Sequence, residues 1–172
     1  MRPDVLNRLY RRYNRRSYVH PDPLEFLYHY PRVQDREIVG LIASSLAYGR
    51  VAQILASVQL ILDPMGLSPH AFLMRTSDRA LATRFRSFKH RFTTGREIAA
   101  LLSGAKAAIV RHGSLNACFV AGLRASDETI LPALGQFARQ IQPGRSYLVP
   151  CPADGSACKR LNLFLRWMVR KD

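Results

Sequence analysis

The stretch DREIVGLIASSL, residues 35–46, decides the fold class. Its apolar residues recur every three or four positions, which is the period of a helix that buries one face. Asp35 has the residue type of a helix N-cap, and Gly49 can end the helix before another begins near Val51. The stretch therefore predicts two consecutive helices between residues 35 and 62.

The same period dominates the rest of the chain, and strict alternation of apolar and polar residues is not sustained anywhere. We expect an all-α, multi-helix globular domain that spans residues 1–172 as a single unit. Cap and breaker residues predict further helices over about 3–16 and 24–28, after Ser68-Pro69, after Ser77, from the capping box Thr94-Gly95-Arg96-Glu97 to about Arg111, after Ser114, and over about 130–141 and 156–170.

The chain is strongly basic. It holds 26 Lys plus Arg against 12 Asp plus Glu, for a formal net charge of +14. Such an excess attracts polyanions, and most of the basic residues are arginines, whose planar fork binds phosphate through two parallel hydrogen bonds. The alternative is a general bias toward arginine usage without a functional cause.

The placement of the basic residues favours an external anion. Residues 2–16 hold six arginines against Asp4, residues 75–96 hold seven basic residues against Asp78, and residues 159–171 hold five and no acid. A solvated helix face usually mixes the two signs. We therefore expect a nucleic acid, duplex DNA in particular, to bind through its phosphates, which requires the three clusters to converge on one face.

Aromatic residues interleave with the first two basic clusters. They could stack on bases, but their helical spacing favours core packing. The residues concerned are Tyr10, Tyr13, Tyr18, Phe85, Phe88 and Phe92.

The three cysteines, Cys118, Cys151 and Cys158, form no close-spaced disulfide framework, and no signal segment opens the chain, which favours a reducing cytoplasm. Cys151 and Cys158 are spaced more widely than structural zinc ligands usually are, so we expect no metal site. The sequence also contains no nucleotide-cofactor motif and no apolar stretch of the ~20 residues that a membrane span needs.

The last predicted helix carries the candidate chemistry. Lys159, Asn162 and Arg166 fall on one stripe, beside an apolar stripe of Cys158, Leu161, Leu165 and Met168. Lys159 lies in the first turn, where the positive end of the helix and Arg160 repel a further positive charge, and a neutral lysine is the nucleophile of Schiff-base chemistry. The alternative is an ordinary exposed lysine that contacts phosphate.

Five segments resemble an uncharacterised family of bacterial conserved hypothetical proteins. They are YVHPDPL (18–24), LAYGRV (46–51), HRFTTG (90–95), GSL (113–115) and PADGSACKRLN (152–162). The resemblance covers essentially the whole chain and implies no established activity. It also implies that the natural protein continues past Asp172.

A second, more remote resemblance is to helix-hairpin-helix DNA glycosylases, carried by Ile130–Ile141, the turn to Gly155, and Ser156–Arg170. It implies a partial glycosylase-like architecture with a helix-hairpin-helix-like segment over residues 130–171. In those enzymes the hairpin grips DNA phosphate, and a lysine that corresponds to Lys159 attacks the sugar after base flipping.

The chain departs from this pattern in two places. The connection between the two helices is long and proline-rich, and no counterpart of the assisting aspartate follows the lysine helix before Asp172. Asp154 is predicted to cap the last helix instead.

Together these patterns predict a nucleic-acid-binding helical protein that needs no cofactor. Lys159 is the candidate catalytic residue of a DNA glycosylase/lyase in the full-length protein. Two alternatives stay open: a DNA- or RNA-binding module without catalysis, and a protein-interaction domain for an acidic partner. The expected nucleic-acid contacts are Arg86, Lys89, Arg91, Gly155, Ser156, Lys159, Arg160, Asn162, Arg166 and Arg170.

Overall fold

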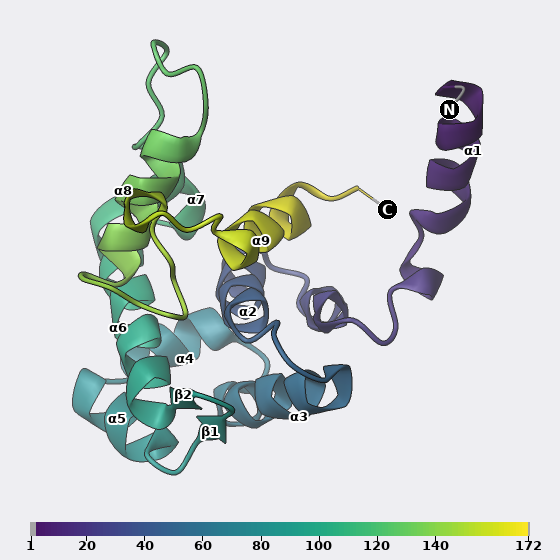
Figure 1. Ribbon diagram of the computed structural model, residues 1–172. Coiled ribbons are helices and arrows are strands. Elements are labelled where there is room, and N and C mark those ends of the chain that lie inside the picture. Colours follow the sequence, from purple (N-terminus) through teal and green to yellow (C-terminus); the bar gives the residue numbers. More distant parts are fainter. Residues whose placement is uncertain (1–2, 172) are drawn as a thin grey trace.

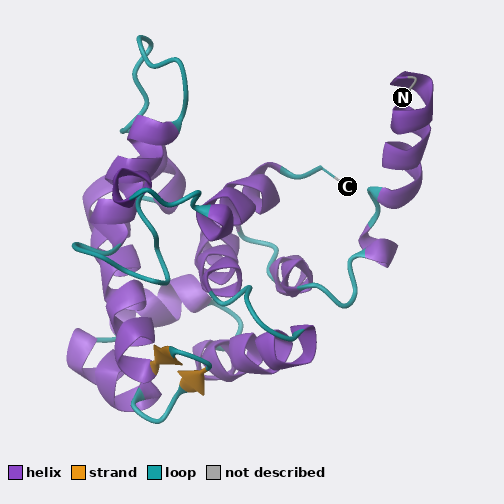
Figure 2. Cartoon of the chain, viewed as in Figure 1, coloured by secondary structure: helices purple, strands orange, loops and turns teal. Residues whose placement is uncertain are grey.

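The computed structural model describes residues 3–171, and helices make up nearly all of their secondary structure, so the all-α prediction is confirmed (Figures 1 and 2). In chain order the elements are α1 (Pro3–Tyr13), η1 (Arg16–Tyr18), η2 (Pro23–His29), α2 (Val33–Ser45), α3 (Val51–Leu62), η3 (Asp63–Met65), α4 (Pro69–Arg75), α5 (Asp78–Phe85), β1 (Lys89–His90), β2 (Thr93–Thr94), α6 (Gly95–His112), α7 (Leu115–Val120), α8 (Leu131–Ile141), η4 (Pro152–Asp154) and α9 (Lys159–Val169), where η denotes a 3-10 helix.

Helix α2 is the centre of the core. Its residues from Ile38 to Leu46 are buried, and it packs against α9, η2, α4 and α3 (Figure 1). Gly40 allows α9 to come close, because a Cβ at this position would lie 3.3 Å from the ring of Phe164. On the other side of the molecule, α6 packs against α5, α7 and α8.

A short β-hairpin, which the sequence patterns did not predict, connects α5 to α6. Strand β1 pairs antiparallel with β2, with Lys89 opposite Thr94 and His90 opposite Thr93. Two-residue strands are too short to show an alternating pattern in the sequence. The hairpin places Arg91 and Phe92 at its tip.

The predicted serine caps are confirmed. Ser68, Ser77 and Ser114 each accept a hydrogen bond from the backbone N–H three residues further on, at 3.2, 3.3 and 2.9 Å. In the predicted capping box, the carboxylate of Glu97 accepts from the N–H of Thr94 at 2.7 Å. These bonds fix the starts of α4, α5, α7 and α6 from within the local sequence.

Asp35 does not cap α2, contrary to the prediction, because α2 begins at Val33 and its cap position is Arg32. The buried carboxylate of Asp35 accepts from the hydroxyl of Ser68 and the N–H of His70, both at 2.9 Å, and so stabilises the start of α4. Glu37, also buried, does the same for α7 by accepting from the N–H groups of Leu115 and Asn116, at 3.0 and 2.9 Å.

The last helix begins at Lys159, three residues later than predicted. Cys158 takes the cap position with a left-handed φ of 48°, and its N–H donates to the hydroxyl of Ser156 at 3.1 Å. Asp154 therefore does not cap α9; it lies 3.8 Å from Arg145 as an ion pair.

The buried face of α9 is also shifted from the predicted stripe. It consists of Leu161, Phe164 and Trp167, whereas Leu165 and Met168 are half-buried. Contact with α2 selects this face, since Phe164 packs against Gly40.

Helix α1 stands clear of the other helices in Figure 1 and ends at Tyr13, earlier than predicted. The prediction that the first aromatic group packs in the core is wrong, because Tyr10, Tyr13 and Tyr18 are exposed. In the second group, Phe85 is buried and Phe88 is half-buried, as predicted, but Phe92 is 71% exposed.

In the described part of the chain no single helix is long and apolar enough to cross a membrane. Only the bent pair formed by Val51–Met65 and Pro69–Arg75 meets such criteria jointly.

Candidate nucleic-acid interface

A cleft of about 430 Å³ lies at the amino end of α9. Its walls include Tyr48 from the α2–α3 turn, Tyr147 and Ser156 from the connection between α8 and α9, and Lys159 and Arg160 from the first turn of α9. Tyr48 precedes Tyr147 by 99 positions in the sequence, so the cleft exists only in the folded chain.

Tyr48 is fixed in place by the β-hairpin. The ring of His90 is buried, and its Nε2 lies 3.0 Å from the carbonyl oxygen of Tyr48, which can only accept, so Nε2 carries a proton. The hydroxyl of Ser57 can then donate to Nδ1 of His90, at 2.8 Å. In return, the hydroxyl of Tyr48 donates to the carbonyl oxygen of His90 at 3.1 Å and lies 2.6 Å from Oγ1 of Thr93.

This environment alters the acidity of Tyr48. Burial raises the pKa of its hydroxyl above the ordinary value of 10.0, although the hydrogen bond with Thr93 and the charge of Arg160 act in the opposite direction. Tyr48 therefore stays protonated, and its hydrogen bonds to the hairpin persist across the neutral pH range.

Gly49 lets the hairpin close over this turn. Its φ of 106° is in the left-handed region, and a Cβ here would lie 2.9 Å from Cδ of Arg91. The Arg91 side chain thus lies against the turn, and its guanidinium carbon lies 5.5 Å from the ring centroid of Phe92.

The connection between α8 and α9, residues 142–158, is well packed despite its length. Leu148 and Val149 are buried, and their N–H groups donate to the hydroxyl of Ser146 at 3.1 and 3.3 Å. The thiol of Cys158 donates to the carbonyl oxygen of Pro150 at 3.2 Å, and burial raises the pKa of this thiol. These contacts hold Tyr147 half-exposed at the cleft.

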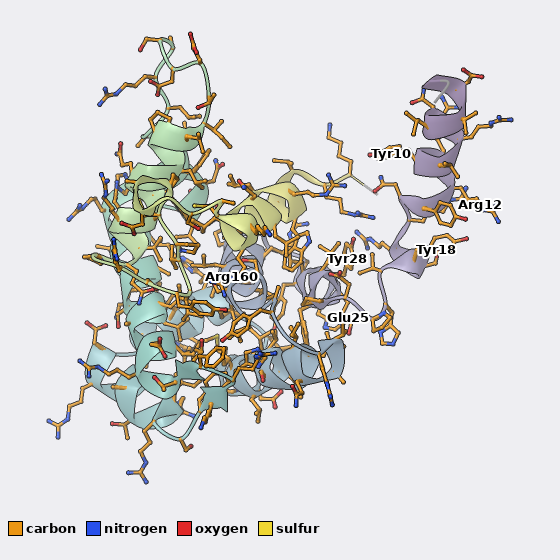
Figure 3. All side chains as sticks on the ribbon, viewed as in Figure 1. Tyr10, Arg12, Tyr18, Glu25, Tyr28 and Arg160 are labelled. Atoms are coloured by element: carbon orange, nitrogen blue, oxygen red, sulfur yellow. The ribbon has the colours of Figure 1, made fainter. Side chains whose placement is uncertain are left out.

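Arg160 joins the aromatic residues into one assembly. Its guanidinium carbon lies 4.2 Å from the ring centroid of Tyr147 and 5.1 Å from that of Tyr48, and the group donates to the carbonyl oxygen of Tyr147. The ring of Tyr147 meets Tyr48 edge-on at 5.2 Å and Phe92 edge-on at 6.4 Å. Figure 3 labels Arg160 at the start of α9. We call Tyr48, Phe92, Tyr147 and Arg160 the aromatic assembly.

Lys159 is the first residue of α9, as predicted for a first-turn lysine, and its exposed side chain borders the aromatic assembly. The N–H groups of residues 159–161 precede the first i to i−4 bond of the helix, from Asn162 to Cys158 at 2.9 Å. Such amides favour anions. Among the described residues that line the cleft there is no carboxylate.

Of the other predicted nucleic-acid contacts, some line the cleft and others lie elsewhere. Ser156 lines the cleft, whereas the side chain of Asn162 donates to the carbonyl oxygen of Ala157 at 3.1 Å and so has a structural role. Gly155 ends η4 with a φ of 75°. Arg166 and Arg170 lie toward the other end of α9, where they border different pockets. Arg86 and Lys89 are exposed near the hairpin, with no described contact to the cleft.

The three basic clusters do not converge on one face. Arg91 of the second cluster lies against Gly49, next to the cleft residue Tyr48, while Arg75, Arg79 and Arg84 line a separate pocket on α4 and α5. Arg16 of the first cluster lies near the carboxyl end of α9. Arg16 shares that pocket with Arg170 and Lys171 of the third cluster, so two of the three clusters meet there. Because the three clusters do not all meet, charge supports nucleic-acid binding less strongly than expected, and we argue a nucleic-acid site from the cleft.

Sequence reasoning missed Tyr48 and Tyr147 and assigned Phe92 to the core. A local signal did exist for the first, since LAYGRV pairs an aromatic residue with a turn glycine between two helices. No local pattern could show that these rings meet Arg160.

No curated protein and no solved structure matches the chain. The model of one protein family, described as a protein of unknown function (DUF2400), matches residues 22–172, which include the whole cleft. The expected membership of a family without an established activity is confirmed in this form. The chain therefore belongs to the DUF2400 family of proteins of unknown function.

Proposed function

We propose that this protein binds nucleic acid at the amino end of α9. The observation that supports this most is the aromatic assembly beside Lys159, in which exposed Phe92 and half-exposed Tyr147 offer ring surface next to cations. Stacking of bases on aromatic side chains is tolerant of sequence and contributes roughly 1–3 kcal/mol per base.

In this proposal the cations and the rings have different tasks. Lys159, Arg91 and the first-turn amides of α9 hold backbone phosphates, while Phe92 and Tyr147 receive a base that has left its stack. The segment 130–171, which contains α8, the connection and α9, would act as the helix-hairpin-helix-like part. An acidic protein partner would satisfy the cations but would leave the rings without a role, so we favour duplex DNA.

The binding test is a titration of labelled duplex DNA, single-stranded DNA and RNA at several salt concentrations, followed by fluorescence anisotropy. We expect the affinity to fall steeply with salt because phosphate binding releases counterions. Phe92→Ala should weaken binding about 5- to 10-fold, in line with the loss of one stacking contact. Leu67→Ala is the matched control, because Leu67 is 96% exposed and does not line the cleft.

A flat salt response, or equal binding by Phe92→Ala and the unaltered protein, would contradict the proposal. Tighter binding of single-stranded RNA than of duplex DNA would support the binding-module alternative with a different nucleic acid.

A catalytic role is a second candidate, favoured by the exposed amine of Lys159 within the cleft. The neutral Nζ would attack C1′ of a damaged nucleotide and displace the base, which leaves with the bonding electron pair and takes up a proton. The C1′–O4′ bond would then break, with O4′ taking a proton from the attacking amine, as the C1′=N bond of the imine forms. The resemblance to glycosylases places the assisting carboxylate after the lysine helix.

Borohydride reduction of the full-length protein with DNA that contains an abasic site or oxidised guanine tests this step. We expect a covalent adduct that Lys159→Gln abolishes and Lys171→Gln retains. No adduct under any condition would exclude the lyase and leave the binding function intact.

A further inference from the structure

A second pocket, of about 370 Å³, lies at the carboxyl end of α9. Four cationic residues line it, together with aromatic and apolar side chains, and no acidic residue does so among the described residues. The four are Arg16, Arg36, Arg170 and Lys171. The volume is within the range of about 300–1,000 Å³ that is usual for small-molecule sites.

Arg36 is the residue that indicates a ligand. Its Nε is buried and has no hydrogen-bond acceptor in the described part of the chain. Buried donors are nearly always satisfied in native proteins, and an unsatisfied one costs free energy. An acceptor supplied by a bound molecule would remove this cost.

The carboxylates next to Arg36 in the sequence do not neutralise it. Asp35 accepts from Ser68 and His70 at the start of α4, and Glu37 accepts from Leu115 and Asn116 at the start of α7. Both acids are therefore engaged with other helices, and α2 directs Arg36 toward a pocket without acid. Glu25 of η2 is also engaged, since it pairs with His20 at 2.8 Å.

The pocket contains a second guanidinium, that of Arg16, which an aromatic ring holds in place. The guanidinium of Arg16 lies 4.5 Å from the ring centroid of Tyr28, which occupies one of its faces and leaves its in-plane N–H groups available. The side chain of Asn14 donates to the carbonyl oxygen of Lys171 at 2.6 Å, which ties the two ends of the chain together beside the pocket. In Figure 1 the chain leaves α9 toward α1 on this side, and Figure 3 labels Tyr28 and Glu25 on η2.

We infer that this pocket binds a phosphate monoester, held by Arg16, Arg36 and Lys171. A dianionic phosphate matches a site that has several cations and no acid among its described lining residues, and guanidinium forks bind its oxygens in pairs. The group could belong to a free phosphorylated molecule or to the 5′ end of a nucleic-acid strand. The inference does not depend on the proposed function, because the cleft is at the opposite end of α9, about 16 Å away for an 11-residue helix.

Trp167 provides the readout. It is the single tryptophan of the chain, it is buried, and it lines this pocket. Its fluorescence can be followed while inorganic phosphate, adenosine monophosphate and adenosine are added separately. A parallel arm compares an oligonucleotide that carries a 5′ phosphate with the same strand ending in a hydroxyl.

We expect a saturable fluorescence change with the phosphate-bearing ligands and none with adenosine. Arg36→Gln should weaken the response at least 10-fold, while Arg79→Gln, which removes an exposed arginine of α5, should leave it unchanged. Arg16→Gln, at an exposed position, repeats the test in case Arg36→Gln does not fold, as judged by circular dichroism.

The choice of added ligand distinguishes a free phosphorylated molecule from the 5′ end of a strand. A response to inorganic phosphate and the monophosphate supports a site for free phosphorylated molecules, and a response to the 5′-phosphorylated strand alone supports a strand end. No saturable response to any of them, or an equal response in both folded variants, overturns the inference. Because Phe92→Ala leaves this pocket intact, failure of the proposed function is recognised independently.

Discussion

An arginine side chain lies near each end of α9, and the two differ in whether their hydrogen bonds are made within the protein: Arg160 belongs to α9 itself, and Arg36 belongs to the neighbouring α2. At the amino end, Arg160 lies over the ring of Tyr147 and donates to its carbonyl oxygen, so its contacts within the protein are already made. At the carboxyl end, Nε of Arg36 is buried with no acceptor among the described residues. The arginine at the amino end is thus already paired within the protein, whereas the one at the carboxyl end has a buried donor for which we propose an anion as partner.

This difference shows why net charge is a poor guide to function in this chain. The guanidinium of Arg160 lies over the ring of Tyr147 and already donates one hydrogen bond to its carbonyl oxygen. Arg160 therefore adds flat surface to the aromatic assembly as well as charge. Nε of Arg36 has no acceptor among the described residues, and in our inference a bound phosphate supplies one. The same residue type therefore supports two different proposals, base stacking at one end of the helix and phosphate binding at the other.

The largest expected effect comes from removing the support of the amino end. His90→Ala deletes the ring that connects Ser57 to the backbone of Tyr48, and it removes the donor to the part-buried carbonyl oxygen of Tyr48. We expect the free energy of unfolding to fall by about 3 kcal/mol, from the lost hydrogen bonds and the cavity. Urea denaturation measures this loss.

His29→Ala is the matched control, since His29 is exposed, and it should change the free energy of unfolding by about 0.5 kcal/mol or less. In folded His90→Ala protein the phosphate response of Trp167 should persist while nucleic-acid binding is lost. Equal stability of the two variants would show that the network around His90 does not hold the cleft.

A smaller effect, on ligand affinity, should show whether the two ends of α9 bind their ligands independently. Tyr147→Ala removes the ring against which Arg160 lies, so we expect the affinity for nucleic acid to fall about 10-fold, equivalent to about 1.4 kcal/mol. Its phosphate response should be unchanged, and Arg36→Gln should show the reverse pattern. If each variant impaired both ligands, the two ends would be parts of one site.

The smallest expected effect is on how the free energy of unfolding depends on pH. Burial raises the pKa of Tyr48 in the folded protein, so above 10.0 the unfolded chain loses this proton first. The stability that protonated Tyr48 contributes is fully present below pH 10.0 and is lost as the pH rises through the folded value.

Tyr48→Phe tests this sign. The unaltered protein should be more stable than the variant by about 1 kcal/mol at neutral pH, because of the hydrogen bond to the carbonyl oxygen of His90. This gap should narrow as the pH passes 10.0, which denaturation at a series of pH values would show. Other groups with raised pKa values, such as Tyr30 and Cys118, are common to both proteins and cancel in the difference. A constant gap would contradict the assignment.

Much of the helical architecture could be predicted, because its signals lie within one turn. Ser68, Ser77 and Ser114 cap helices through bonds that span three residues, and a sequence pattern can identify such bonds. Asp35 has the same residue type but bonds to residues 33 and 35 positions away. Its role could not be predicted, because nothing nearby in the sequence distinguishes a local cap from a distant one.

The candidate site shows the same division. Lys159 in the first turn of the last helix, and the membership of a family without a known activity, followed from motifs in the sequence. Phe92 was assigned to the core because its spacing is compatible with a helix, whereas the tertiary structure places it at a hairpin tip.

The sequence by itself determined the all-α class, most helix starts, the excess of arginine and the place of Lys159, since each depends on composition or on residues within a few positions. Only the tertiary structure decided which cations meet which partners. In the folded chain, Asp35 and Glu37 accept from the starts of other helices and Arg160 lies over the ring of Tyr48, whereas Nε of Arg36 has no acceptor among the described residues. These outcomes depend on packing between distant segments, which hydrophobic periodicity permits but does not specify.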